Sequence, residues 1–202
     1  DVKVKTEGEI DIGAPFVLTD HDGVTRDSKK DYGGKFMLIY FGFTYCPDIC
    51  PTELTKMSEV MNRLEELGKS DYVTPIMITV DPYRDSVEQI RSYVKEFHPK
   101  LVGLTGSPAQ IKQVAKDFKI YNFVPENAGE EDYLVDHSVF TFLMGPNGGY
   151  LDFFGPDKSE EMITDRVLER ISDLEDERNP PSLSVRISRK LEHWKKRVSS
   201  MF

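Results

Sequence analysis

Residues 36–51 read FMLIYFGFTYCPDICP, and this stretch decides how the rest of the chain is expected to fold. Its first eight residues are apolar and bounded by Gly and Pro, which is typical of a strand buried on both faces of a sheet. From Pro51 the apolar residues recur at helical spacing, at positions 54, 57, 61, 64 and 67. Gly68 supplies a stop signal for that helix. The sequence therefore predicts a strand followed by a helix, with Cys46 and Cys50 at the junction.

The alternation of strand and helix continues along the chain. Further strands are predicted at 73–80, 101–104, 134–144 and 150–154. Further helices are predicted at 87–97, 107–118 and 159–174. Residues 16–25 predict a small hairpin near the N-terminus, and a turn at 146–149 joins the last two strands. Repeated β-α-β units followed by a hairpin predict an α/β fold, with a mixed central sheet flanked by helices.

Composition excludes several classes of protein. The chain has 202 residues, 39% hydrophobic and 30% charged, which indicates one globular domain with an appendage. Its longest apolar run is far shorter than the roughly 20 residues that a membrane span needs. The sequence opens without an initiator Met, a basic segment or an apolar leader. We therefore expect a mature or truncated form whose signal or membrane tether lies outside this chain.

Charge divides the chain into an acidic body and a basic tail. Residues 181–202 hold six Lys and Arg and one acid, whereas the net charge of the whole chain is −9. An acidic body argues against nucleic acid as a partner. We expect a domain at 1–174 with its core at about 15–171, a linker at 175–182, and a basic amphipathic helical tail at 183–202. This tail would either dock on the body or a partner helix, or lie on an anionic membrane surface.

The two cysteines carry the chemistry that the sequence predicts. Cys46 and Cys50 are four residues apart, so a helix that begins near Pro47 would place both sulfurs on one face at its N-terminus. The positive end of the helix dipole favours thiolate over thiol there. Two thiolates exchange disulfides or hold a soft metal ion. Two cysteines in a chain of this size do not form a disulfide framework.

A metal site would need further ligands from the four histidines. His21 lies in the predicted hairpin turn and is expected to be solvated, His98 ends a predicted helix, and His193 lies in the basic tail. His137 differs because it follows Asp136 where a polar loop enters an apolar strand, although a lone His at the start of a strand is more often structural than a metal ligand. Two thiolates and one imidazole suit trigonal Cu(I), whereas zinc would remain one ligand short.

Several blocks of sequence resemble the Sco family of copper chaperones. The first is residues 41–51, with both cysteines. The others are VDPYRD at 80–85, LVGLTG at 101–106, DYLVDH at 132–137, and GPNG at 145–148 with LDFFG at 151–155. The blocks occur in the same order as in the family, from about Pro15 to Ile171. Their residues are more similar to those of the mitochondrial branch of the family than to those of the bacterial branch.

The resemblance implies more than the residues alone. It implies a thioredoxin-like fold that binds copper, as Cu(I) or Cu(II), through Cys46, Cys50 and His137. It implies delivery of copper to the dinuclear site of cytochrome c oxidase subunit II, and supply by an upstream copper donor chaperone. It also implies a domain in the mitochondrial intermembrane space, tethered to the inner membrane by a helix outside this chain. The tail beyond about Leu174 departs from the family pattern.

Two other functions compete with the metallochaperone. In a thiol–disulfide reductase acting on the cysteines of the same target, Cys46 and Cys50 would be the catalytic pair. A peroxidase-like thioredoxin relative would need one low-pKa thiolate beside an arginine, for which Arg84 is the candidate. Met57 and Met61 lie on the apolar stripe of the predicted helix, so we expect them in the core rather than on copper.

Overall fold

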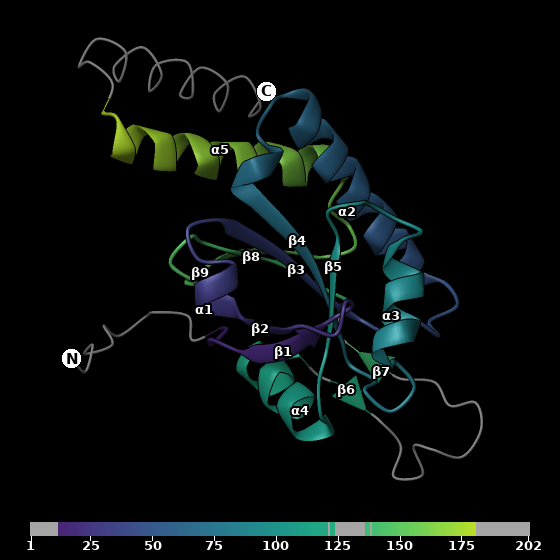
Figure 1. The fold of residues 1–202 in the computed structure, drawn as a ribbon. Coiled ribbons are helices and arrows are strands. Elements are labelled where there is room, and N and C mark those ends of the chain that lie inside the picture. Colours follow the sequence, from purple (N-terminus) through teal and green to yellow (C-terminus); the bar gives the residue numbers. More distant parts are fainter. Residues whose placement is uncertain (1–11, 121, 124–135, 138, 181–202) are drawn as a thin grey trace, which may run out of the picture. The chain divides into compact units, whose positions relative to one another are not determined.

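The computed structural model describes residues 12–120, 122–123, 136–137 and 139–180. The chain divides into two compact units, residues 1–164 and 165–202. The first unit contains a seven-stranded sheet with the strand order β2-β1-β5-β4-β3-β8-β9 (Figure 1). Parallel and antiparallel pairs both occur in this sheet. The predicted α/β fold with a mixed central sheet is therefore confirmed.

The elements follow the predicted alternation. The strands of the large sheet are β1 (Val17–Asp20), β2 (Thr25–Asp27), β3 (Phe36–Gly42), β4 (Val73–Thr79), β5 (Val102–Thr105), β8 (Thr141–Met144) and β9 (Tyr150–Phe154). The helices are α1 (Ser28–Asp31), α2 (Ile49–Glu66), the 3-10 helix η1 (Ser70–Tyr72), α3 (Val87–Val94), α4 (Pro108–Asp117) and α5 (Glu160–Arg178). A separate antiparallel pair joins β6 (Asn122–Phe123) to β7 (Asp136–His137).

Strand β3 forms the centre of the sheet, and all seven of its residues are buried. It pairs in parallel with β4 and antiparallel with β8. Because successive side chains point to opposite faces, Tyr40 faces α2 whereas Phe41 packs against Phe118 and Phe142, with ring centroids 5.1 and 6.0 Å apart. Helices therefore cover both faces of β3, which explains its continuous apolar sequence.

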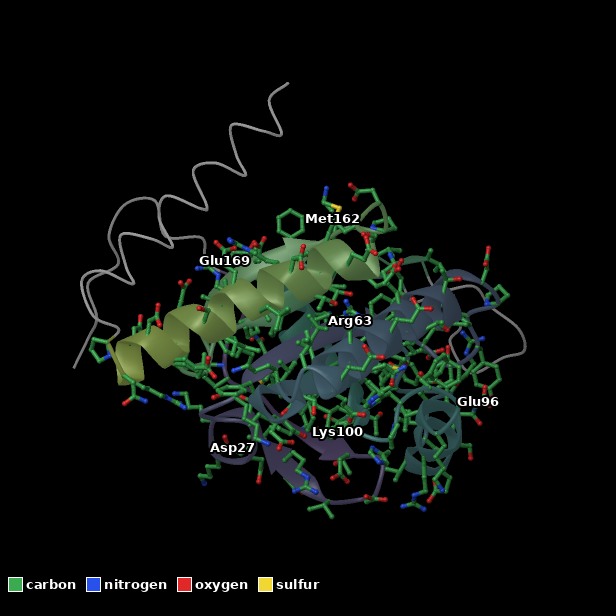
Figure 2. The ribbon with its side chains drawn as sticks, turned by 90° about the horizontal axis from the view of Figure 1, so that it is seen from above. Asp27, Arg63, Glu96, Lys100, Met162 and Glu169 are labelled. Atoms are coloured by element: carbon green, nitrogen blue, oxygen red, sulfur yellow. The ribbon has the colours of Figure 1, made fainter. Side chains whose placement is uncertain are left out.

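Helix α2 packs one side on the sheet and leaves the other in solvent. Met57 and Met61 are buried, as predicted for core residues. Arg63 lies on the outward side (Figure 2), with 65% of its side chain exposed. It pairs with Glu66 one turn later. The apolar stripe of the sequence thus fixes which face of α2 meets the sheet.

Several elements differ from the predictions, and helix α3 ends at Val94 rather than at 97. The strand expected at 134–144 is divided into β7 and β8, which belong to different sheets. Helix α5 continues to Arg178, four residues into the segment expected to be a linker, because no Gly or Pro interrupts residues 160–178. Short helix α1 was not predicted, and it begins where the Asp27 side chain accepts the backbone N–H groups of Lys29 and Lys30.

The predicted basic tail at 183–202 lies outside the described residues. Within the part of the chain that is described, none of the helices combines the length and apolar character needed to span a bilayer.

Candidate metal and dithiol site

The site lies where β3, β4 and β5 end. These three strands run parallel, so the segments that follow Gly42, Thr79 and Thr105 emerge at the same edge of the sheet. Residues 43–48 lead from β3 into α2, and residues 80–86 lead from β4 into α3. This edge is where open α/β sheets usually bind their ligands.

The cysteines meet at the start of α2. Cys46 lies in the segment just before the helix, and Cys50 lies in its first turn. Neither is in a disulfide, and the backbone N–H of Cys50 donates a hydrogen bond to Cys46 Sγ at 3.4 Å. The sulfur of Cys46 thus accepts from one of the N–H groups that a helix start leaves without an intrahelical partner. The structure brings the two predicted residues together.

The two thiols differ in their access to solvent. The side chain of Cys50 has no exposed surface, whereas Cys46 remains 9% exposed. A reacting partner or an incoming metal therefore meets Cys46 first. This asymmetry arises because α2 begins at Ile49 rather than near Pro47, so only Cys50 lies on the helical face that packs on the sheet.

Tyr40 reaches the inner cysteine from β3. Its hydroxyl donates a hydrogen bond to Cys50 Sγ at 3.4 Å, and both side chains are fully buried. Gly42 leaves the space that this contact needs. A Cβ at residue 42 would lie 2.6 Å from the Tyr40 ring and 3.0 Å from Cys50 Sγ.

Burial dominates the acidity of the inner thiol. Removal from water raises the pKa of Cys50 to about 12, although hydrogen bonds from Tyr40 and the Phe43 backbone partly oppose this rise. Burial and the neighbouring Cys50 also raise the pKa of the Tyr40 hydroxyl. The prediction that the helix N-terminus would make both cysteines acidic is therefore wrong for Cys50.

Asp85 fixes the segment that carries Cys46. Its carboxylate is fully buried and accepts the backbone N–H of Thr44 at 3.1 and 3.3 Å. The hydroxyls of Thr44 and Thr79 each donate to it at 2.6 Å. A single side chain therefore joins the segment after β3 to the end of β4. Burial raises the pKa of Asp85, and the hydrogen bonds from Thr44 and Thr79 oppose this rise.

Arg84 serves a different purpose from the one a peroxidase needs. Its Nε donates to the buried carboxylate of Asp81 at 2.5 Å. Its guanidinium lies over the ring of Tyr45, 5.0 Å from the centroid, and 5.8 Å from that of Phe43. Arg84 is therefore engaged by a carboxylate and two rings, which argues against a thiolate-activating role.

His137 is the third predicted ligand. Its backbone belongs to β7 and pairs with Asn122 of β6. Its imidazole lies outside the described side chains, so its approach to the cysteines stays a prediction. Among the side chains that are described, no three His, Cys, Asp or Glu residues gather into a possible metal site.

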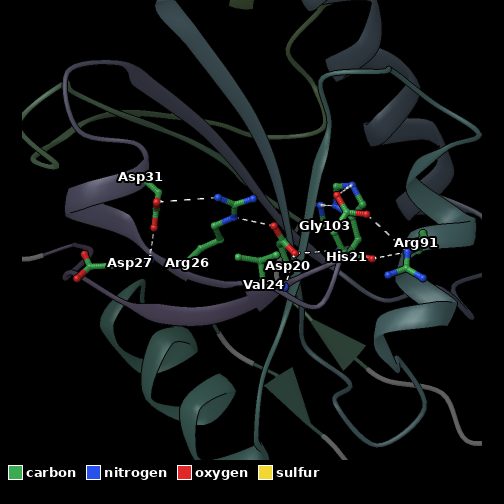
Figure 3. A network of polar contacts seen from close by, with 9 residues as sticks. Asp20, His21, Val24, Arg26, Asp27, Asp31, Arg91 and Gly103 are labelled. Atoms are coloured by element: carbon green, nitrogen blue, oxygen red, sulfur yellow. Dashed lines mark hydrogen bonds and ion pairs between the residues drawn. The ribbon is translucent and has the colours of Figure 1, made fainter.

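Two other histidines have structural roles. His21 was expected to be solvated, but its Nδ1 accepts the backbone N–H of Gly103 at 3.1 Å, and its carbonyl accepts Arg91 Nε at 2.7 Å (Figure 3). His98 is buried, and its Nδ1 accepts the backbone N–H of Lys100. His193 lies outside the described residues. His21 and His98 are therefore occupied away from the cysteine pair.

The sequence analysis missed two residues of the site. Tyr40 was hidden in an apolar run, where a hydroxyl among aliphatic neighbours was the only signal. Asp85 lies inside the VDPYRD block at 80–85, but nothing local in that block shows that its carboxylate meets Thr44. The cap of the next helix, α3, is Ser86, which accepts the backbone N–H of Gln89. Buried polar side chains require hydrogen-bond partners, but their identity depends on contacts between distant segments.

A reduced cysteine pair at the junction of a central strand and its following helix defines this chain as a thioredoxin-like dithiol protein. The family described as SCO1/SenC matches residues 4–172. The chain belongs to the SCO1/SenC family.

Known relatives extend this assignment. The human protein SCO1 homolog, mitochondrial, is 48% identical over 152 residues, which cover 75% of this chain and 50% of that protein. The crystal structure of Arabidopsis thaliana ScoI with copper bound is 45% identical, with a TM-score of 0.73, and the match covers 80% of this chain and 99% of that one.

A more distant structure is BsSco, described as a member of the Sco family of cytochrome c oxidase assembly proteins with a disulfide switch. It is 25% identical with a TM-score of 0.65, over 82% of this chain and 96% of that one. This chain spans about half the length of the curated relatives it matches.

Proposed function

We propose that this protein is a copper metallochaperone that binds copper through Cys46, Cys50 and His137. The observation that carries the proposal is the pair of reduced sulfurs at the start of α2, where the N–H of Cys50 meets Cys46 Sγ at 3.4 Å. Thiolates are soft ligands that prefer Cu(I), and an imidazole completes trigonal coordination. Copper-bound relatives with the same fold support the choice of metal.

The arrangement of the site suits transfer of the ion. A three-coordinate ion leaves room for a ligand from a partner to bind before any ligand leaves. Cys46 is the more exposed sulfur, so exchange would begin there, while Cys50 holds the ion from the buried side. Copper binding must displace the Cys50 proton, which makes affinity depend on pH.

The proposed acceptor is the dinuclear copper site of cytochrome c oxidase subunit II, and the proposed source is an upstream copper donor chaperone. The association of a relative with cytochrome c oxidase assembly supports an oxidase target. The relatives named mitochondrial support a mitochondrial location. Within the mitochondrion, the proposed place of action is the intermembrane space, at the inner membrane.

The second candidate is a thiol–disulfide reductase. Cys46 and Cys50 would reduce a disulfide of the target, transferring two electrons and two protons as their own disulfide forms. The close approach of the two cysteines and the disulfide switch of BsSco favour this activity. The two functions use the same pair and are compatible.

The test is reconstitution of the full chain with Cu(I) under anaerobic, reducing conditions. We expect about one copper per chain, lost in Cys46→Ala and His137→Ala but kept in His193→Ala, which changes a histidine outside the ligand set. Full copper content in His137→Ala would remove that residue from the site. No stable copper, together with a reversible Cys46–Cys50 disulfide, would establish the reductase instead.

A further inference from the structure

Two exposed tyrosines flank the cysteine pair. Tyr45 directly precedes Cys46 and is 51% exposed, and Tyr83 lies in the segment after the neighbouring strand β4 and is 57% exposed. Aromatic side chains, tyrosine among them, are enriched where proteins bind one another. Both segments emerge at the edge of the sheet that carries the thiols.

The ring of Tyr45 is held in place before any partner arrives. The buried carboxylate of Asp81 binds Arg84, whose guanidinium lies 5.0 Å from the Tyr45 ring centroid. Asp85 fixes the preceding residue, Thr44, through its backbone and its hydroxyl. A ring ordered in this way loses little conformational entropy on binding, which favours its use as an anchor.

The exposed charges in the two segments that carry these rings have one sign. In segments 43–50 and 81–90, the charged residues classed as exposed are Asp48 and Glu88, both acids. The cation of these segments, Arg84, has only 18% of its side chain exposed and is paired with Asp81. The surface that these two described segments form is therefore aromatic and acidic.

We infer that Tyr45 and Tyr83, with Asp48 and Glu88 at their border, form the docking surface for the protein that exchanges copper with Cys46. This inference rests on the proposed copper-binding function. Its partner would present a cysteine ligand flanked by an apolar side chain and by Lys or Arg. The apolar group would pack on the tyrosine rings, and the cations would face the two carboxylates. The acidic body of a second copy fits the surface poorly.

The test compares two copper acceptors of different size. The full chain is loaded with Cu(I) anaerobically and mixed with bathocuproine disulfonate, or with a twelve-residue peptide that has two cysteines, a leucine and two lysines. We expect Tyr45→Ala/Tyr83→Ala to slow transfer to the peptide about tenfold or more and to leave transfer to the small chelator unchanged. Leu67→Ala is the matched control, because it removes a 48% exposed side chain at the other end of α2.

Three results would overturn the inference. The first is that the double variant and the wild type transfer copper to the peptide at equal rates. The second is that, relative to the wild type, the double variant slows copper transfer to the peptide and to the chelator equally. The third is that the wild type forms a dimer and the double variant does not. A peptide with glutamates in place of its lysines should accept copper more slowly from the wild type, and added salt should reduce that difference.

A copper-free measurement separates this inference from the proposed function. Fluorescence anisotropy of the lysine peptide with serines in place of its cysteines reports docking alone. Wild-type protein that binds no Cu(I) would refute the copper chaperone, whereas weaker peptide binding in the double variant would still support the docking surface. Unchanged peptide binding in the double variant would refute the docking surface alone.

Discussion

The hydroxyl of Tyr40 in β3 donates a hydrogen bond to the sulfur of Cys50 in α2 at 3.4 Å, within the buried layer between sheet and helix. A core strand, β3, thus contacts the reactive thiol that the core helix α2 carries. The strand supplies a hydrogen-bond donor to a thiol that has no contact with water. Because this bond opposes the rise in the pKa of Cys50, it favours the thiolate that a metal requires.

Tyr40→Phe should weaken Cu(I) binding at neutral pH by about tenfold or more, because a hydrogen bond to a charged group contributes about 1.5–3 kcal/mol. The loss should be smaller at high pH, where deprotonation of Cys50 needs less help. Competition with a Cu(I) chelator across pH measures this effect. Tyr32→Phe is the control, since its buried hydroxyl has no hydrogen-bond partner among the described residues. Equal losses in both variants would contradict the role assigned to Tyr40.

Asp85→Asn should disturb the cysteine segment more than it disturbs the fold. The amide group cannot accept all of the hydrogen bonds from Thr44 and Thr79 that the carboxylate accepts. We expect a loss of about 1–3 kcal/mol in the free energy of unfolding, and weaker Cu(I) binding. Urea unfolding and chelator competition measure the two effects.

Asp20→Asn is a matched control for Asp85→Asn. Asp20 is also buried and accepts the backbone N–H groups of Asp22 and Val24 together with Arg26 Nε, but it holds the β1–β2 hairpin (Figure 3). The Asp20→Asn variant should therefore have a lower free energy of unfolding and an unchanged Cu(I) affinity. A parallel loss of copper affinity in both variants would show that Asp85 acts only through overall stability.

Much of the fold could be predicted from the sequence because its signals are local. The apolar run at 36–43 and the helical spacing after Pro51 depend on neighbouring residues, and they correctly placed Cys46 and Cys50 at a strand–helix junction. The acidity of Cys50 could not be predicted, because it depends on the depth at which α2 packs and on a hydroxyl ten residues earlier.

The error at residues 134–144 came from the same limit. Residues 134–144 read as one apolar strand, but hydrophobic pattern does not show which sheet a segment joins. The role of Asp85 depends on Thr44, 41 positions away, and so was equally invisible to local analysis.

Gly42→Ala should damage the site through contact rather than through backbone strain. The added Cβ would lie 2.6 Å from the Tyr40 ring and 3.0 Å from Cys50 Sγ, so one of these buried groups must shift. We expect a loss of about 1–3 kcal/mol in the free energy of unfolding, and a large loss of Cu(I) affinity. Gly23→Ala provides the contrast, because residue 23 has a φ of +80° and open space around its Cβ position. The Gly23→Ala variant should lose stability and keep its copper affinity. The prediction for Gly42 fails if the Gly42→Ala variant binds copper as the wild type does.

His98 should make the stability of the fold sensitive to mild acid. Its Nδ1 accepts the N–H of Lys100, so a proton added there would break that bond, and burial lowers the pKa of the imidazole below its ordinary 6.5. Between the folded and unfolded pKa values the unfolded chain binds more protons, so the free energy of unfolding rises with pH. The contribution of His98 is therefore complete above about pH 6.5 and is lost as the pH falls below it.

Urea unfolding of wild type and His98→Asn between pH 7.5 and 5 measures this dependence. The wild type should lose more stability than the variant over that range, since the variant has no imidazole to protonate at residue 98. His193→Ala, which changes a histidine of the tail, should follow the wild type. Identical pH profiles for wild type and His98→Asn would show that His98 does not control the acid sensitivity of the fold.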